Sequence, residues 1–133
     1  MLENAYARKK MRRRGLVAWL NPRGRRVGYW AFVLHRLTGL GLVLYLIIHL
    51  WVLNMLSQGP ERWNDFVELA KSPLFLVLDV ILLFGILFHG LNGIRVAFVG
   101  MGIGADQHER LFWAVSLIGA LLLLLGAWGF FTV

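Results

Sequence analysis

The sequence contains no cysteine. Without a thiol, the chain cannot form disulfides, hold an iron–sulfur cluster, build a thiolate metal site or use a cysteine nucleophile. Any metal or redox centre in this chain must therefore depend on histidine, carboxylate or methionine ligands. With 4 histidines in the whole sequence, the candidate ligands are few.

Acidic residues are scarce as well, with 7 Asp and Glu against 14 Lys and Arg and a formal net charge of +7. Hydrophobic residues make up 59% of the 133 residues, and the mean hydropathy is +0.66. A domain of this length could not cover so much apolar surface with polar side chains. The composition therefore predicts a membrane protein and argues against a compact soluble domain.

The positive charge is concentrated near the N-terminus. Residues 1–28 hold nine Lys and Arg residues against one acid, Glu3, and the rest of the chain is close to neutral. Because this segment directly precedes a long apolar run, membrane topology and anionic lipid explain it better than nucleic acid does. We expect a basic cytoplasmic arm over residues 1–28, with no nucleic-acid partner.

Three apolar runs are long enough to cross a bilayer, which requires ~20 residues. They cover residues 29–56, 73–100 and 111–132, and Gly, Pro and Ser residues separate them. Between the first two, residues 61–71 show helical spacing of apolar side chains, which predicts a short helix at the membrane interface. These side chains are Trp63, Phe66, Val67 and Ala70.

The sequence thus predicts an all-α membrane protein, with a three-helix transmembrane domain over residues 29–133. The arm and the loop around Arg110 carry more cations than the other loop, which contains Arg62 and Lys71. Cations favour the cytoplasmic side of a membrane. We therefore expect a multi-pass protein of the cell's inner, cytoplasmic membrane, with its N-terminus in the cytoplasm.

Ionisable side chains inside hydrocarbon are costly and usually face a cavity, a partner or a cofactor. Those within the predicted spans are His35, Arg36, His49, Asp79, His89 and Arg95. At a rise of ~1.5 Å per residue, His89 lies ~16 Å from the nearer end of its span, close to the membrane centre. Gly85 and Gly93 stand four residues before and after it, which would leave room beside the imidazole for a flat macrocycle.

The residue chemistry leaves several roles open for His89: a hydrogen-bonded packing residue, a proton relay, or an axial ligand of haem iron. For a haem, Arg36 and Arg95 lie closer to the cytoplasmic end and could neutralise the propionates. Glycines at this spacing also mediate helix packing alone. His35 and Arg36 could equally bind lipid phosphate at the interface.

His49 is a second candidate ligand. Its expected depth is close to that of Asp79, which predicts either a simple hydrogen-bonded pair or a metal-bound imidazole oriented by a carboxylate. Tyr45 and Leu53 would crowd the approach to His49, from four residues before and after it. His49 also shares a helix face with His35 and Gly39, as a cofactor-lined or partner-facing surface would require.

Two motifs carry a family resemblance. The first is Leu34-His35-Arg36-Leu37-Thr38-Gly39, and the second is His89-Gly90-Leu91-Asn92-Gly93-Ile94-Arg95. Together with the Asn21-Pro22 element before them, they resemble the two signatures of the cytochrome b membrane-anchor subunit of succinate dehydrogenase, over about residues 20–133. As a pair, H-R-x-[TS]-G and H-x-x-x-G-I-R are fairly specific.

The resemblance implies roles for individual residues. His89 would be an axial ligand of haem b, with the other ligand supplied by a second small anchor subunit. The propionate neighbours would be Arg36, His35 and Arg95. The quinone-binding residues would be Arg36, His35, Phe32 and Tyr29, with Phe32 at the position where the family usually has serine.

The resemblance also implies cofactors and partners. The cofactors would be haem b, either one or, with His49 as a further ligand, two, and menaquinone or ubiquinone. The partners would be a second small membrane anchor subunit, an iron–sulfur subunit, a flavoprotein subunit and membrane lipid. The chain would then be a non-catalytic subunit that carries electrons to quinone. Three rival functions remain: a fumarate reductase anchor, a quinone-independent b-type cytochrome, and a purely structural anchor without cofactor.

Overall fold

The computed structural model of the protein describes residues 27–132. In chain order these residues form α3 (Val27–Leu53), the 3₁₀ helix η1 (Asn54–Gln58), α4 (Pro60–Ala70), α5 (Pro73–Gly100), the 3₁₀ helix η2 (Ala105–Gln107) and α6 (His108–Thr132). No strand occurs within residues 27–132, and the predicted all-α class is confirmed. Of the predicted arm over residues 1–28, all but the last two residues lie outside the described part of the chain.

The three predicted spans are present as helices long and apolar enough to cross a membrane. They run over Val27–Gln58, Pro73–Gly100 and Ala105–Thr132. The third begins earlier than predicted because the charged segment before Leu111 is itself helical. Helix α6 begins at His108, and Glu109 stands in its first turn, where the helix dipole favours an acid.

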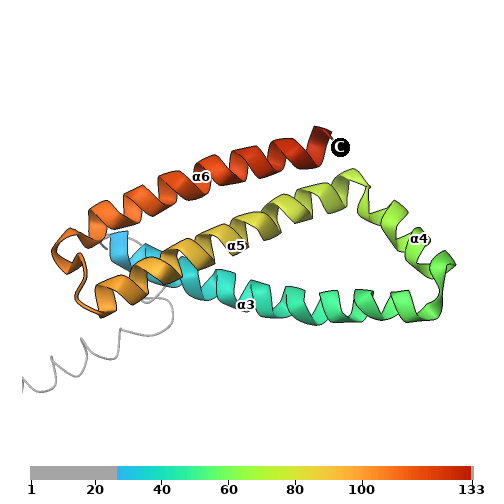
Figure 1. Ribbon diagram of the computed structural model, residues 1–133, viewed down its shortest axis with the longest axis horizontal. Helices are drawn as coiled ribbons and strands as arrows, with labels where there is room; N and C mark the ends of the chain where they lie inside the picture. Colours follow the sequence, from blue (N-terminus) through green and yellow to red (C-terminus); the bar gives the residue numbers. More distant parts are fainter. Residues whose placement is uncertain (1–26, 133) are drawn as a thin grey trace, which may run out of the picture.

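Helix α5 lies between α3 and α6 (Figure 1). The first half of α3 passes the second half of α5, and the two helices then diverge toward the opposite end of the molecule, where α4 joins them (Figure 1). The start of α3, the end of α5 and the start of α6 therefore lie at one end. The two sequence motifs consequently meet at the crossing of α3 and α5.

Glycine and proline define the boundaries between the helices. Gly59 has a φ of 107°, and the following Pro60 occupies the first turn of α4. Ser72 is extended and precedes Pro73 at the start of α5. After α5 ends, Gly102 and Gly104 adopt φ values of 84° and 69°. Residues with a side chain rarely adopt such values, and the two glycines let the chain turn back into α6.

The short helix α4 confirms the predicted amphipathic element. Its apolar side chains Trp63, Phe66, Val67 and Ala70 are half-buried, whereas its charged residues are exposed. The ring of Phe66 lies 6.5 Å from that of Phe75 in an edge-to-face contact, which fixes α4 against the start of α5. This arrangement suits a helix at a membrane surface.

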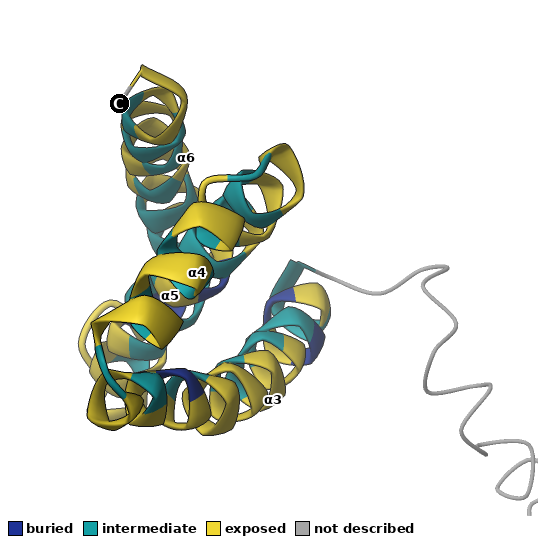
Figure 2. Ribbon diagram, turned by 90° about the vertical axis from the view of Figure 1, so that its right-hand side faces the viewer, coloured by how far each residue is buried: buried dark blue, intermediate teal, exposed yellow. Residues whose placement is uncertain are grey.

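Few residues are buried within the chain itself. The buried apolar side chains among residues 27–132 are Ala31, Val33 and Val52, and the buried polar ones are Asn92 and Arg95. Figure 2 shows exposed residues along the outer surfaces of all the long helices. Large apolar side chains cover these surfaces, which suits contact with lipid or with other membrane helices.

Candidate functional site

The site is centred on His89, at the crossing of α3 and α5. The His89 and His35 rings are stacked, with centroids 4.0 Å apart and planes inclined by 6°. Because 54 residues separate the two histidines, only the helix crossing brings them together. The crossing therefore joins one histidine of each motif.

The backbone of α3 engages one nitrogen of the His89 ring. Nδ1 lies 3.0 Å from the carbonyl oxygen of His35 and 3.4 Å from Oγ1 of Thr38. A carbonyl oxygen only accepts, so Nδ1 must carry the proton, and in the neutral ring Nε2 keeps its lone pair. No hydrogen bond to Nε2 is present within residues 27–132, which leaves this nitrogen available as a ligand.

Glycines shape the crossing on both helices. A Cβ at Gly39 would lie 2.8 Å from Cε1 of His89, and a Cβ at Gly93 would lie 3.4 Å from Cε1 of His35. A Cβ at Gly85 would lie 3.8 Å from Leu42. Side chains of α3 therefore lie in contact with the two positions, Gly85 and Gly93, that the sequence predicted to leave room for a macrocycle.

Arg95, the last residue of the second motif, is buried rather than open. Its Nε donates to Oδ1 of Asn92 at 3.0 Å, and one terminal nitrogen donates to the carbonyl of His108 at 3.3 Å. The guanidinium also lies 5.6 Å from the ring centre of Phe112. Arg95 thus joins the end of α5 to the start of α6.

Arg36 is placed differently. Its guanidinium lies over the Phe32 ring, 4.6 Å from the centroid, and both residues are exposed. Within residues 27–132 it has neither an ion pair nor a hydrogen bond. Tyr29, about two turns before Arg36 on α3, lies beside Trp30 in an edge-to-face contact. The charge of Arg36 therefore has no ionic or hydrogen-bonding partner among the described residues.

The second candidate ligand, His49, lies apart from this site. Its Nδ1 is 3.3 Å from the hydroxyl of Tyr45, and the two rings are 5.3 Å apart. No bond joins His49 to Asp79 within the described residues, so the predicted alternative of a hydrogen-bonded pair is wrong. A shared depth does not bring two side chains together when their helices are apart, and α3 and α5 diverge toward the end where α4 joins them (Figure 1).

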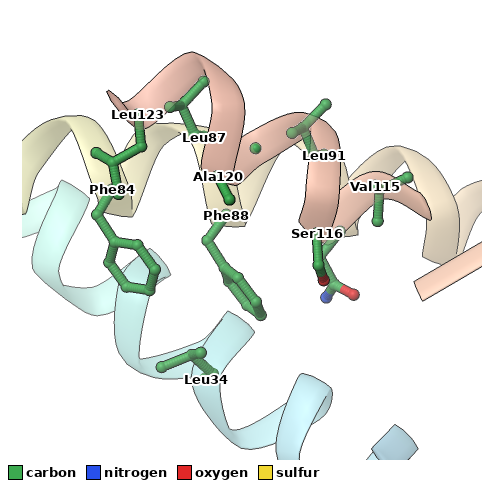
Figure 3. A pocket seen from close by; sticks show the side chains of 11 residues that line it. Leu34, Phe84, Leu87, Phe88, Leu91, Val115, Ser116, Ala120 and Leu123 are labelled. Carbon is green, nitrogen blue, oxygen red and sulfur yellow. The ribbon is translucent and has the colours of Figure 1, made fainter. Parts of the chain in front are cut away.

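A cavity of about 250 Å³ opens on α5 next to the crossing. Helices α3, α5 and α6 all contribute to it, and Figure 3 shows Phe84, Phe88 and Leu34 around it. Its complete lining is Leu34, Phe84, Leu87, Phe88, Leu91, Asn92, Val115, Ser116, Gly119, Ala120 and Leu123. Asn92 is 2% exposed, and its Nδ2 has no hydrogen-bond partner in the described part of the chain.

Within residues 27–132, no group of three or more His, Cys, Asp or Glu could hold a metal ion. This finding does not count against a haem, because the porphyrin itself supplies four of the iron ligands and a protein adds only axial ones. Among the described residues, His89 is therefore a candidate for a single imidazole ligand.

Three residues of the site were not predicted from the sequence. Thr38 and Gly39 stand inside the first motif, and the sequence placed Gly39 on one helix face with His35 and His49, but the contact of both residues with His89 depends on the helix crossing. The contact of Asn92 with Arg95 was not predicted either. Their spacing of three residues places both on one helix face, and this spacing could have indicated the contact.

Comparisons with known proteins identify relatives. The family described as "Succinate dehydrogenase/Fumarate reductase transmembrane subunit" matches residues 8–131. The chain is similar to the succinate dehydrogenase hydrophobic membrane anchor subunit of Halobacterium salinarum, with 40% identity over 88 residues, 65% of this chain and 68% of the relative.

Two further relatives cover more of the chain. The succinate dehydrogenase 2 membrane subunit SdhC of Mycobacterium tuberculosis is 32% identical over 98 residues, 74% of this chain and 71% of the relative. The C subunit of fumarate reductase from Photorhabdus laumondii is 25% identical over 107 residues, 74% of this chain and 82% of the relative. The relatives thus include proteins named for both reaction directions.

Proposed function

This chain belongs to the family of succinate dehydrogenase and fumarate reductase transmembrane subunits. On that premise we propose that it binds haem b and, as a membrane anchor of a succinate dehydrogenase, helps to deliver electrons to quinone. A bound haem supplies one-electron transfer. The flavoprotein and iron–sulfur partners would carry out the succinate chemistry, and a second small anchor subunit would supply the haem ligand that this chain does not.

The observation that carries this proposal is the state of the His89 imidazole. Its Nδ1 is engaged by the carbonyl of His35 at 3.0 Å, so that the unbonded Nε2 has the lone pair that iron requires. A ligating histidine almost always has its second nitrogen held in this way. This arrangement supports His89 as the residue that would ligate haem iron.

The cations around the site fit the propionates and the quinone to different degrees. Arg36 is exposed, has no acidic partner within residues 27–132 and lies one turn after Phe32, which supports it as the group that binds propionate or a quinone oxygen. His35 and Tyr29 complete the proposed quinone neighbourhood on α3. Arg95 already donates to Asn92 and His108. We therefore assign it a weaker role than Arg36 in neutralising the propionates.

The decisive experiment is the visible spectrum of the purified, dithionite-reduced complex. We expect a haem b absorption band in the wild type, its loss in His89→Ala and its retention in the matched control His108→Ala. A wild-type complex without the band would show that the chain is a structural anchor. Retention of full haem content in His89→Ala would reject His89 as the ligand.

The ratio of haem to flavin tests the number of haems. We propose one haem, at His89, because His49 lies away from the crossing and bonds to Tyr45. A ratio near one supports this proposal. A ratio near two, reduced to one by His49→Ala, would instead assign the second haem to His49.

The direction of the reaction follows from turnover rates. The proposal of quinone reduction predicts that the complex oxidises succinate with quinone faster than it reduces fumarate with quinol. The opposite ratio would identify the anchor of a fumarate reductase, as the name of the Photorhabdus laumondii relative suggests.

The membrane orientation has a direct test because the natural chain has no cysteine. We propose that the N-terminus and the loop between α5 and α6 face the cytoplasm of a bacterial or archaeal cell. Single cysteines at Asp106 and at Lys71 would lie on opposite sides of the membrane. In intact cells, a membrane-impermeant maleimide should label Lys71→Cys and spare Asp106→Cys, and the reverse pattern would invert the topology.

A further inference from the structure

Thr38 and Gly39, in the second half of the first motif, contact a residue of another helix. Gly39 lies close beside the His89 ring, since a Cβ there would lie 2.8 Å from Cε1 and 3.3 Å from Nδ1. Thr38 places its hydroxyl oxygen 3.4 Å from Nδ1. Neither contact follows from a role in binding quinone, which the proposed function assigns to the first half of the motif.

We infer that Thr38 and Gly39 are positioning residues that fix the tautomer and the ring orientation of His89. The inference rests on the proposed function in one respect: the nitrogen so prepared is the one that would bind iron. The geometry of the ring itself is a property of this chain and can be measured without haem.

The tautomer is selected by two acceptors. The hydroxyl of Thr38 has a single proton, which is directed to the carbonyls of Leu34 and His35, at 2.8 and 3.0 Å. Its oxygen therefore faces Nδ1 of His89 as an acceptor, in addition to the carbonyl of His35 at 3.0 Å. The carbonyl of His35 can only accept, and the hydroxyl proton of Thr38 is directed to the backbone, so this arrangement favours a proton on Nδ1 over one on Nε2.

The ring orientation is selected by close packing. Because Gly39 has no Cβ, the edge of the ring that contains Cε1 and Nδ1 can approach the backbone of α3 closely enough for these bonds. A second histidine also packs against a glycine of the other helix: His35 of α3 lies against Gly93 of α5 and stacks flat on His89. A methyl group at position 39 would push the ring outward and lengthen both contacts to Nδ1.

The chain contains matched controls. Gly41 is on the same helix, two residues further on, and a Cβ there would meet nothing within 4 Å. Gly41→Ala therefore changes helix propensity as Gly39→Ala does, without contact to His89. At position 38, Thr38→Ser keeps the hydroxyl, whereas Thr38→Val keeps the shape and removes the acceptor.

The test uses the intact complex and three readouts that do not depend on turnover. These are the haem-to-flavin ratio, the largest g value in the low-spin EPR spectrum of the oxidised haem, and its midpoint potential. We expect Gly39→Ala and Thr38→Val to shift the g value and the potential and to weaken haem retention about tenfold, as loss of such supporting contacts does. Gly41→Ala and Thr38→Ser should match the wild type.

Wild-type g value, potential and haem content in both Gly39→Ala and Thr38→Val would overturn the inference. Should Gly39→Ala fail to assemble, Thr38→Val, which is nearly isosteric, decides alone. Equal shifts in Gly41→Ala would show a general effect on α3 and would also overturn it.

Failure of the proposed function gives a different pattern. If His89→Ala keeps its haem, the ligand assignment is wrong, but NMR of isotopically labelled histidine nitrogens in the full chain, reconstituted in lipid, still tests the positioning. We expect a protonated Nδ1 on His89 in the wild type and a measurable fraction of the other tautomer in Thr38→Val. An unchanged tautomer in Thr38→Val and Gly39→Ala would refute the positioning role whatever the ligand.

Discussion

The guanidinium of Arg95 and the amide of Asn92, one turn apart on α5, form a buried hydrogen bond of 3.0 Å. The bond fixes the orientation of the amide, because Nε of arginine only donates and must face Oδ1. With a second bond to the carbonyl of His108, Arg95 closes the contact between α5 and α6. A residue of the family motif thus supports the helix packing as well as contributing charge.

This arrangement predicts that shape matters more than charge at position 95. Arg95→Lys keeps the charge but lacks the fork that reaches two acceptors, so we expect it to lower the free energy of unfolding by about 2 kcal/mol, close to the effect of Arg95→Gln. Thermal denaturation of the purified complex measures the loss, with Arg110→Lys as the exposed control. Wild-type stability of Arg95→Lys alongside an unstable Arg95→Gln would show that charge alone is required.

Arg36 should affect quinone chemistry without affecting succinate oxidation. A hydrogen bond to a charged group contributes ~1.5–3 kcal/mol, so Arg36→Gln should lower the rate of quinone reduction about tenfold or more. The rate with a soluble dye that accepts electrons from the partner subunits should be unchanged. Arg62→Gln, at an exposed position of α4 at the other end of the molecule, serves as the control. Equal loss of both activities in Arg36→Gln would indicate faulty assembly instead.

Glycines on α6 differ in what surrounds them. A Cβ at Gly126 would overlap Cδ2 of Leu83 on α5, whereas a Cβ at Gly129 would meet nothing within 4 Å. We therefore expect Gly126→Val to destabilise the α5–α6 pair by about 1–3 kcal/mol through overpacking. Gly129→Val should have little effect on the same melting curve. Equal effects of the two variants would mean that helix propensity, rather than packing, governs both.

The turn between α5 and α6 should depend on Gly104. Its φ of 69° is left-handed, and a Cβ there would lie 2.7 Å from Leu111. Gly104→Ala should therefore cost about 1–2 kcal/mol. Gly100→Ala, in the last turn of α5 with open space around it, should be neutral or slightly stabilising. A neutral Gly104→Ala in the same denaturation experiment would contradict the strain at this turn.

The sequence was sufficient for the elements of the fold. Apolar runs of about the thickness of a bilayer predicted the spans, and the spacing of Trp63, Phe66 and Val67 predicted α4. The segment from His108 to Arg110 was expected to be a loop because it is charged. A first helical turn outside the apolar run tolerates such residues, and hydropathy alone does not reveal it.

The candidate site was predicted less completely. The position of a residue along its helix gives its depth in the membrane but not its distance from residues of other helices. The rise per residue placed His89 near the centre of its span and put His49 level with Asp79. It could not show that α3 and α5 cross where His35 meets His89, or that the two helices diverge toward α4 (Figure 1). For the same reason, Gly85 and Gly93 were expected to make room for a cofactor, whereas Leu42 and His35 lie against them.

The separation of α3 from α5 toward the α4 end bears on how the protein is made in the cell. There, Val43, Leu44, Ile47 and Leu50 of α3 are exposed within the chain and gain little from its own helices. A newly inserted chain without a partner subunit would expose this apolar segment of α3 to membrane-bound proteases. We expect its steady-state amount to fall sharply when it is synthesised alone and to recover on co-expression.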